Sequence, residues 1–263
     1  VVTFAAVYIV VGGGVAAAPQ AEVWPRWERH DPDASISVDH SRWDAFLARY
    51  VVDDHPVGVN RVRYAAIDGD ARRRLDAYLE QMATVPVDEL SRDEQLPYWI
   101  NVYNAVTVRL IADHYPLESI RDVPRPWDTP LFTVEGVELT LNDIEHRIIR
   151  PIWRDERIHF LVNCASIGCP DLLPVALTAD NYDNLADAAV ERYLSHRRGA
   201  RYEGGKLVLS TIFDWYGEDF GDDRDEILDY VARYAPDDLA RRLRHYDGRV
   251  RYEYDWSLND AER

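Results

Sequence analysis

The chain has 263 residues, and 47 acidic side chains against 30 basic ones give it a formal net charge of −17. Lys206 is the only lysine, and the arginines are interspersed with acids, so no basic patch offsets the repulsion from phosphate groups. We therefore expect neither nucleic acid nor an anionic membrane surface among its partners. Hydrophobic residues make up 47% of the sequence, which is enough for a folded core.

The N-terminal segment is almost purely apolar. Residues 1–11 carry no charge, and glycines and other small residues follow as far as Ala21. This pattern predicts a secretory signal over residues 1–21, cleaved near Ala18 or Ala21, and hence a periplasmic or secreted protein. An apolar core of about 11 residues is shorter than the ~20 that a membrane-crossing helix needs. We expect no stable membrane span after cleavage; an uncleaved N-terminal anchor is the alternative.

Residues 22–41 are rich in proline, aspartate and serine and are expected to form a linker. Residues 42–259 contain no break long enough to separate two domains, and residues 260–263 form a short tail. The first half of this single domain has mainly helical signals. The expected elements are a helix over Trp43–Tyr50 capped by Ser41, a strand over Val59–Ile67, a helix over Asp70–Thr84, and a long helix over Asp93–His114 opened by a capping box of Ser91 and Glu94.

The second half of the domain mixes short strands with helices. The expected elements are a hairpin of Leu131–Val134 and Val137–Thr140, a helix from Thr140 to Arg150 stopped by Pro151, a strand over Arg157–Cys164, a helix over Ala179–His196, a hairpin of Arg201–Glu203 and Lys206–Ser210, helices over Asp222–Tyr234 and Pro236–Arg244, and a last strand over Val250–Tyr254. No regular strand–helix–strand repeat occurs. The predicted fold class is therefore α+β, with several helices and short, mainly antiparallel strands.

The only two cysteines lie where the expected strand after His159 runs into a turn of small residues. A cysteine at such a junction can act as a nucleophile when a cation or backbone N–H groups lower its pKa. Because the cysteines are close in sequence and export favours oxidation, a Cys164–Cys169 disulfide or a pair of inert buried thiols is the alternative. Side chains alternate along a strand, so His159 and Cys164 would face opposite ways. His159 would then partner another element or be a satisfied core histidine.

Two further pairs of polar residues are candidates for the site. Glu145 and His146 are adjacent on an expected helix, where His146 could act as a general base oriented by Glu145; the alternative is a surface histidine in a charged turn. Asn101 and Asn104 share one face of an apolar helix, where each amide needs hydrogen-bond partners. They would orient a catalytic group or bind an oxyanion, or, as is more common for such amides, pin a neighbouring loop.

The remaining signals are weaker. Ser210–Phe220 is dense in aromatic and acidic residues, which would wall a cleft or, in the simpler interpretation, form a short helix packed on the core. The sequence has no glycine-rich phosphate loop, no His-Glu-x-x-His pair and no Gly-x-Ser-x-Gly elbow. The cysteine spacing fits no common zinc site. We therefore expect no cofactor and no metal.

Several motifs occur together in a fixed order. They are Glu94–Ala105, Leu141–Arg150, Arg157–Pro170, Phe213–Tyr216 and Tyr254–Asn259. The first three resemble the domain-of-unknown-function family 547, and the last two resemble its bacterial members. The likeness covers residues 40–259, whereas Asn163 and Ala165 depart from the valine and glycine of the family pattern.

The resemblance implies one site built from the cysteines, the Glu-His pair, the preceding histidine and the helix asparagines. In this chain these residues are Cys164, Cys169, Glu145, His146, His159, Asn101 and Asn104. Plant relatives join the domain to glutaredoxin-like or leucine-zipper regions, which points to thiol chemistry or to scaffolding without choosing between them.

The leading hypothesis is an exported cysteine-dependent hydrolase or acyl transferase, papain- or transglutaminase-like, that acts on an envelope peptide or amide. The nucleophile would be Cys164 or Cys169 and the base His146 or His159, while one of the helix asparagines would hold the oxyanion or the histidine. One alternative is a non-enzymatic envelope domain that has a Cys164–Cys169 disulfide and binds a ligand in an aromatic groove. The other is a thiol–disulfide redox protein.

Overall fold

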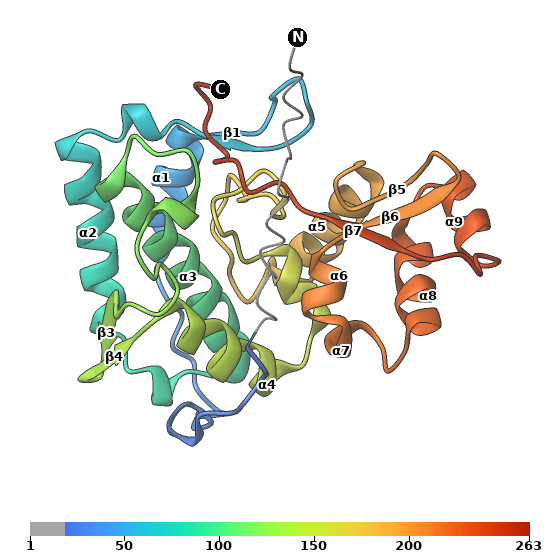
Figure 1. Ribbon diagram of the computed structural model, residues 1–263. Helices are drawn as coiled ribbons and strands as arrows, with labels where there is room; N and C mark the ends of the chain where they lie inside the picture. The colour runs from blue at the N-terminus through green and yellow to red at the C-terminus, as the bar shows by residue number, and fades with distance from the viewer. Residues whose placement is uncertain (1–18) are drawn as a thin grey trace, which may run out of the picture.

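The computed structural model describes residues 19–263 as one α+β body, which confirms the expected fold class (Figure 1). Most of the expected signal or anchor, residues 1–18, lies outside the described residues. The helices of the described chain are α1 (Ser41–Tyr50), α2 (Gly69–Ala83), α3 (Arg92–His114), α4 (Arg150–Trp153), α5 (Tyr182–Ser195), α6 (Ile212–Trp215), α7 (Gly217–Phe220), α8 (Arg224–Tyr234) and α9 (Asp237–Leu243).

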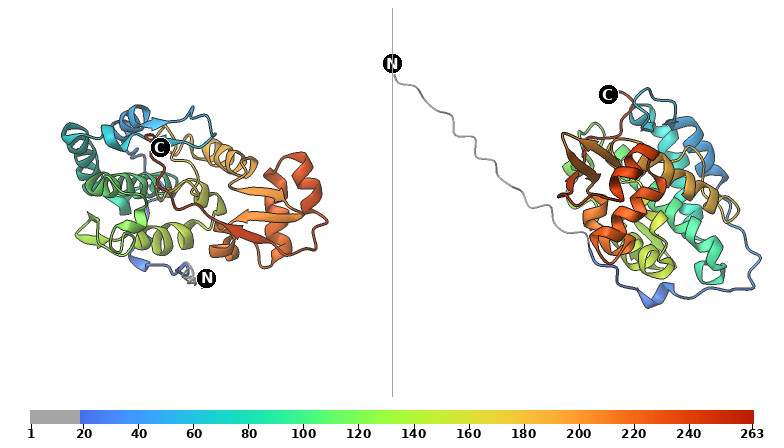
Figure 2. Two further views of the ribbon diagram at one scale, coloured as in Figure 1. Left: turned by 45° about the horizontal axis from the view of Figure 1, so that its top comes forward. Right: turned by 90° about the vertical axis from the view of Figure 1, so that its right-hand side faces the viewer.

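Short strands form three small sheets. β1 (Val51–Val52) pairs with β2 (Arg61–Val62), and β3 (Phe132–Val134) pairs with β4 (Val137–Leu139), both antiparallel. In the third sheet β6 (Lys206–Ser210) lies between antiparallel β5 (Ala200–Glu203) and parallel β7 (Arg251–Glu253). Figure 2 shows this sheet with α8 and α9 at one end of the molecule and α1–α3 at the other.

Helix α3 is the most deeply buried element. Seventeen of its 23 residues are buried, so apolar side chains cover every face and other elements must enclose it. It begins after Ser91, whose hydroxyl accepts the N–H of Glu94 as the predicted capping box requires. The other half of the box does not form, because the Glu94 carboxylate accepts the backbone N–H of Val38 instead.

The expected linker, residues 22–41, contains a 3-10 turn over Pro25–Trp27 and a second turn at residues 32–33, is otherwise irregular, and runs into α1 at Ser41. Trp27 within it is buried and packs edge-on against Trp99 of α3, with ring centroids 5.0 Å apart. The backbone N–H groups of Glu22 and Trp24 donate to carbonyls of the helix that carries the Glu-His pair. This segment therefore reaches the candidate site from one side.

The strand expected over Arg157–Cys164 is wrong. A 3-10 helix spans Glu156–Phe160, opened by the Asp155 side chain, which accepts the N–H of Arg157, and an irregular loop follows. The prediction failed because a short buried apolar run has the same pattern in a strand and in a helical turn. The alternation that set His159 and Cys164 on opposite faces does not apply.

Two more expected elements differ in kind. In the strand expected over Val59–Ile67 only the two residues of β2 pair, and a 3-10 turn over Tyr64–Ala66 follows. The helix expected to stop at Pro151 is a π-helix over Asp143–Ile149 that continues into α4. Pro151 cannot donate to the helix, but the carbonyls of His146 and Arg147 before it accept the N–H groups of Glu22 and Trp24, so the proline does not end the helix.

The remaining helices, both hairpins and the last strand are confirmed, with ends displaced by up to three residues. The aromatic segment forms α6 and α7, as the simpler interpretation predicted. Helix α1 begins at Ser41 itself, and the Asp39 carboxylate accepts the Ser41 N–H, so Ser41 is not the cap.

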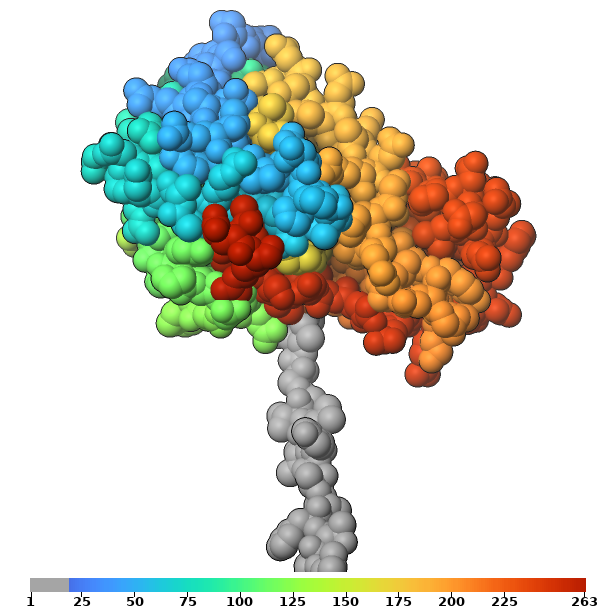
Figure 3. Space-filling model, turned by 90° about the horizontal axis from the view of Figure 1, so that it is seen from above, coloured from blue at the N-terminus to red at the C-terminus, as the bar shows by residue number. Residues whose placement is uncertain are grey.

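The C-terminal segment crosses from β7 to the α1–α3 end and holds the cysteine loop, residues 163–170 (Figure 1). Backbone N–H groups of Ile167 and Gly168 donate to the carbonyls of Ser257 and Asp255, both at 2.8 Å. A Cβ at Gly168 would lie 2.7 Å from the Asp255 nitrogen, so this approach requires glycine. Figure 3 shows the end of the segment, in dark red, lying on the surface against earlier parts of the chain.

Ala165 lies at the head of this loop in the left-handed conformation, with φ +61°. L-residues other than glycine adopt it at a cost, because Cβ approaches the carbonyl oxygen. The glycine of the family pattern fits this conformation, so the alanine of this chain is the strained variant. The Asn163 carboxamide accepts the Ala165 N–H at 2.9 Å and closes the turn.

We expect Ala165→Gly to raise the free energy of unfolding by up to about 1 kcal/mol. The relief of left-handed strain, roughly 1–2 kcal/mol, exceeds the ~0.5–1 kcal/mol of chain entropy that glycine adds. Urea-induced unfolding measures the difference. Ala48→Gly on the exposed face of α1 is the matched control and should lower the same quantity by about 0.5–1 kcal/mol. Equal losses in both variants would contradict the strain.

Candidate functional site

The predicted site residues meet where α3, the π-helix and α6–α7 come together. Glu145 and His146 lie on the π-helix and His159 on the 3-10 helix that follows. Cys164 and Cys169 lie on the cysteine loop. π-Helical turns are frequent at functional sites, and this one places a carboxylate and an imidazole side by side in the interior.

Two hydroxyl groups surround the sulfur of Cys164, which is partly exposed. The Ser166 hydroxyl lies 3.2 Å from the sulfur and the Tyr254 hydroxyl 3.1 Å from it, and the two hydroxyls are 2.9 Å apart. Hydrogen bonding from Cys169 lowers the pKa of Cys164; burial opposes this, and Ser166 and Tyr254 lower the pKa further. The thiolate of Cys164 is thereby favoured relative to an ordinary cysteine.

Cys169 has the opposite environment. It is buried, its sulfur accepts the Cys164 N–H at 3.0 Å, and its thiol faces the Val162 carbonyl at 3.6 Å. Burial raises the pKa of Cys169 well above the usual value, and its hydrogen bond to Cys164 raises it further. Both cysteines are free thiols in the structure.

Glu145 is a buried carboxylate between two phenols. Burial raises the pKa of Tyr103 of α3 and of Tyr216 after α6 well above the ordinary value, and the nearby Glu145 carboxylate raises both further. Burial raises the pKa of Glu145, but the neighbouring histidines, the Tyr103 hydroxyl and Arg150 together bring it below the ordinary value. The negative charge of Glu145 is therefore stabilised in the interior by groups on α3, on the π-helix and on the elements that follow it.

His159 is oriented by Asp219 of α7, which the sequence analysis did not select. The ring Nε2 lies 2.6 Å from the Asp219 Oδ2, and the Arg150 Nε lies 2.7 Å from the same oxygen. Burial raises the pKa of Asp219, but the hydrogen bonds from His159 and Arg150 outweigh it and set the pKa to about 2. The His159 ring also stacks on Tyr216, with centroids 4.3 Å apart. Since Nε2 bonds Asp219, Nδ1 is the ring nitrogen that Asp219 leaves free.

His146 is buried with only 3% of its surface exposed, so the surface-histidine interpretation is wrong. Its Nδ1 lies 3.1 Å from a nitrogen of Arg150, which is always a donor. The Nδ1 of His146 must therefore be the acceptor, and an imidazole ring with an accepting nitrogen is neutral. Burial lowers the pKa of His146, and the positive charge of Arg150 lowers it further against the opposing effect of Glu145, whose carboxylate is 4.0 Å away.

Asn101 and Asn104 pin loops, as the more common interpretation of such amides predicts. Asn101 exchanges two hydrogen bonds with the backbone of Leu177, at 2.8 and 3.1 Å. Asn104 donates to the Leu161 carbonyl at 2.9 Å and accepts the Asn163 N–H at 2.8 Å. Both ends of each carboxamide are occupied, and Asn104 fixes the backbone that leads into Cys164.

The cysteines and the histidines are neighbours without being bonded to each other. Among the described residues, no hydrogen bond joins His146 or His159 to either sulfur. Charge links the two halves: the carboxylate of Glu145 acts to raise the pKa of Cys164, and the Tyr216 phenol interacts with both groups. The structure thus contains a thiol, a carboxylate and an Asp–His pair in one region.

Three contributors were not among the predicted site residues. Tyr216 and Tyr254 lie within the motifs Phe213–Tyr216 and Tyr254–Asn259, which supported the family resemblance but were given no role in the site. Asp219 lies outside every motif, and its only signal was the density of acids and aromatic residues over Ser210–Phe220.

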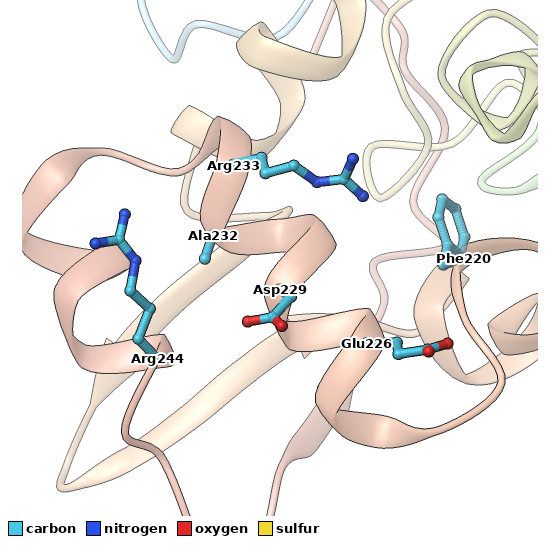
Figure 4. A pocket seen from close by; sticks show the side chains of 6 residues that line it. All are labelled: Phe220, Glu226, Asp229, Ala232, Arg233 and Arg244. Atoms are coloured by element: carbon cyan, nitrogen blue, oxygen red, sulfur yellow. The ribbon is translucent and has the colours of Figure 1, made fainter.

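A separate hollow of about 470 Å³ lies over α8 and α9 (Figure 4). Two acids and two arginines line it, and in the figure their side chains spread apart rather than converge. Phe220 links the hollow to the candidate site, with a ring centroid 5.4 Å from that of His159. Its opposite charges balance, and we assign it no ligand.

Within residues 19–263, no group of three or more histidine, cysteine, aspartate and glutamate side chains is arranged to hold a metal ion. In the same part of the chain, no helix combines the length and the apolar content that a membrane crossing requires.

Asp219→Asn should reduce the pH dependence of stability. Because the pKa of Asp219 is about 2 in the folded protein and about 3.9 in an unfolded chain, its charge stabilises the fold above pH 4. That contribution is lost as the pH falls toward 2. The gap in unfolding free energy between wild type and Asp219→Asn should shrink by about 1 kcal/mol from pH 6 to pH 3.

Chemical unfolding at both pH values measures this gap. Glu218→Gln, which removes the adjacent and mostly exposed partner of Arg150, is the control and should show a small gap that stays nearly constant. A gap that is the same at pH 6 and pH 3 for Asp219→Asn would show that its carboxylate carries no depressed pKa.

Comparison with known proteins covers the central part of the chain. Residues 87–194 match the model of a family described as a protein of unknown function, DUF547. No curated protein and no solved structure matches the chain. The matched range contains all seven site residues expected from the sequence, whereas Tyr216, Asp219 and Tyr254 lie beyond it. Residues 87–194 of this chain are thus a DUF547 domain; the match contains the first three sequence motifs and does not extend over the rest of the expected range, residues 40–259.

Proposed function

We propose that this protein is a cysteine-dependent hydrolase or acyl transferase with Cys164 as its nucleophile. The observation that carries the proposal is the environment of the Cys164 sulfur, which is partly exposed and has the Ser166 and Tyr254 hydroxyls within 3.2 Å. Donors to a sulfur stabilise the thiolate, the form that attacks. Cys169 is buried and has a raised pKa, so we assign it no nucleophilic role. It instead helps to lower the pKa of Cys164.

The contacts of His159 support it as the general base. Asp219 accepts from its Nε2, which leaves Nδ1 to take up a proton and fixes the ring, as the acid of a catalytic triad does. His146 is less suited, because Arg150 occupies its Nδ1 and its pKa is lowered. Hydrogen bonds between a nucleophile and its base often tighten only when substrate is bound, which is the step we assign to His159.

The proposed reaction is acyl transfer through a thioester. The Cys164 thiolate adds to the carbonyl carbon of an amide or ester, and the charge develops on the carbonyl oxygen. We assign the stabilisation of that charge to the hydroxyls of Tyr254 and Ser166, which lie within 3.2 Å of the Cys164 sulfur. Protonated His159 then gives its proton to the leaving amine or alcohol. Water or a second nucleophile attacks the thioester and releases the acyl group.

The comparison with papain and transglutaminases concerns this division of roles. In both, a thiol, a histidine and a third polar group on separate elements act together. Here the asparagines Asn101 and Asn104 are occupied by loops, so we assign them a positioning role. Asp219 takes the orienting role that the sequence analysis gave to Glu145, and Glu145 is a second proton acceptor close to the thiol.

We place the activity outside the cytoplasm, on an envelope peptide or amide. The apolar start of the chain supports export, and it is the only feature that does so. The acidic character of the chain favours substrates without strong negative charge, since like charges repel.

A non-enzymatic binding domain is the second candidate, and an aromatic cluster favours it. The rings of Trp127, Trp215, Tyr254 and Trp256 are all partly exposed, and neighbouring rings have centroids 4.7 to 5.8 Å apart. Such a surface would hold the planar or apolar face of a ligand. In the hydrolase, the same surface would bind substrate beside Cys164.

Cys164→Ser and Cys169→Ser distinguish these functions, because both make the same change in one loop. Turnover of a panel of p-nitrophenyl esters and aminoacyl-coumarin amides by reduced full-length protein is the measurement. We expect Cys164→Ser to lose at least about 100-fold in turnover and Cys169→Ser to lose less than about tenfold.

Circular dichroism and unfolding curves establish that both variants are folded. Retention of full turnover by both variants would contradict the proposal. So would a wild-type protein that turns over nothing in the panel and forms no thioester on Cys164 detectable by mass spectrometry.

A further inference from the structure

We infer that Cys164 and Cys169 are a peroxide-reactive pair, in which a hydroperoxide oxidises Cys164 and Cys169 then closes an intrachain disulfide. The inference uses only the contacts of the cysteine loop and does not depend on the proposed hydrolase activity. It assigns a modification site and a class of oxidant to this pair of thiols. The proposed acyl transfer uses Cys164 and gives Cys169 no chemical step.

The exposure of the two cysteine residues assigns the first step to Cys164. Cys164 is partly exposed, whereas Cys169 is 5% exposed, so a small oxidant reaches Cys164 first. The Ser166 hydroxyl donates to the Tyr254 oxygen at 2.9 Å, and the Tyr254 hydroxyl, 3.1 Å from the Cys164 sulfur, is free to donate to it and stabilise the attacking thiolate.

The backbone of the loop places Cys169 for the second step. Its sulfur lies 3.0 Å from the backbone nitrogen of Cys164, and the Cys169 N–H donates to the Ser166 carbonyl at 3.2 Å, which closes the turn between the two residues. A disulfide can therefore form by side-chain rotation, without separating the loop from the C-terminal segment that holds it.

The two steps balance in atoms and electrons. The Cys164 thiolate attacks one peroxide oxygen, an S–O bond forms, the O–O bond breaks, and the leaving hydroxide takes up a proton to become water. Cys164 is now a sulfenic acid, two electrons more oxidised, and the peroxide is reduced. The Cys169 sulfur then attacks the Cys164 sulfur, an S–S bond forms, the S–O bond breaks, and the departing hydroxide takes the Cys169 proton as a second water.

Reversal needs an external thiol of low molecular weight. Cys164 is the more exposed residue of the pair, so an external thiolate attacks its sulfur, forms a mixed disulfide and releases Cys169. A second external thiolate then attacks the small-molecule sulfur of the mixed disulfide, releases Cys164, and leaves as the oxidised small-molecule disulfide. If the proposed function holds, the disulfide removes the nucleophile and the oxidised protein is inactive; this clause alone depends on that proposal.

The experiment exposes reduced full-length protein to hydrogen peroxide at equimolar amounts. Aliquots are blocked with iodoacetamide, and peptides are mapped by mass spectrometry with and without dithiothreitol. We expect the wild type to form a Cys164–Cys169 disulfide within the chain, Cys169→Ser to stop at a Cys164 sulfenic acid that dimedone traps, and Cys164→Ser to keep Cys169 reduced.

Three results would overturn the inference. They are a wild type in which both thiols stay reduced, a wild type in which Cys164 is oxidised beyond the sulfenic acid while Cys169 stays reduced, and a Cys164→Ser variant in which Cys169 is oxidised as fast as in the wild type. Disulfide formation without ester or amide turnover would count against the hydrolase alone. Turnover that requires Cys164, without disulfide formation, would count against the peroxide pair alone.

A matched pair of tyrosine variants tests the role of the Tyr254 hydroxyl. Tyr254→Phe removes one donor to the sulfur and should slow disulfide formation at pH 7 about tenfold. Tyr252→Phe, two residues earlier on β7 and also partly buried, should leave the rate within about twofold. Equal rates in the two variants would show that Tyr254 does not activate Cys164.

Discussion

The cysteine loop is held from two sides, and the surroundings of Cys164 depend on both. From one side the Asn104 carboxamide of α3 accepts the N–H of Asn163 at 2.8 Å. From the other side the C-terminal segment accepts the N–H groups of Ile167 and Gly168. A buried amide that loses its hydrogen-bond partners costs ~1–3 kcal/mol. Because Asn104 is buried with α3, its carboxamide therefore holds the backbone at Asn163, where the loop begins. Tyr254 reaches the sulfur because the segment that carries it is the one that holds the loop.

A second constraint is the burial of Arg150, whose side chain is 1% exposed. A buried guanidinium requires anionic partners, and removal of one partner from such a pair is strongly destabilising. Asp219 supplies that charge from α7 and in turn orients His159. Arg150 also donates to the Pro19 carbonyl. One buried charge thereby ties together the start of the described chain, the π-helix and the aromatic helices.

The parts of this fold that were predictable from sequence are those set by local signals. The apolar faces of α2 and α3, the Ser91 cap and the Gly204–Gly205 turn act within a few residues, and these elements are confirmed. The run from Arg157 to Cys164 was assigned to the wrong element because its apolar pattern does not distinguish a strand from helical turns. Whether such a run forms a strand or helical turns depends on whether another strand lies beside it, and that is a property of the tertiary structure.

The residues of the candidate site also divide into those set by local sequence signals and those set by tertiary contacts. Cys164, His159 and Glu145 could be selected by residue type and motif. Asp219 could not, because its importance comes from a contact with His159, 60 residues away along the chain, and Tyr254 meets Cys164 across 90 residues. One of the two histidines predicted as the base, His146, accepts a hydrogen bond from the Arg150 guanidinium and has a lowered pKa. Short spacing between residues in sequence was therefore a poor guide to which groups act together.

The pKa of Cys164 is the quantity on which the account depends most directly. The pH dependence of iodoacetamide alkylation, with each cysteine resolved by mass spectrometry, measures it in the full-length reduced protein. We predict a pKa for Cys164 below the ordinary cysteine value of about 8.5, a higher value in Tyr254→Phe, and slow alkylation of Cys169 throughout. A Cys164 pKa at or above the ordinary value that Tyr254→Phe leaves unchanged would contradict the central claim that the hydroxyl groups around this sulfur activate it.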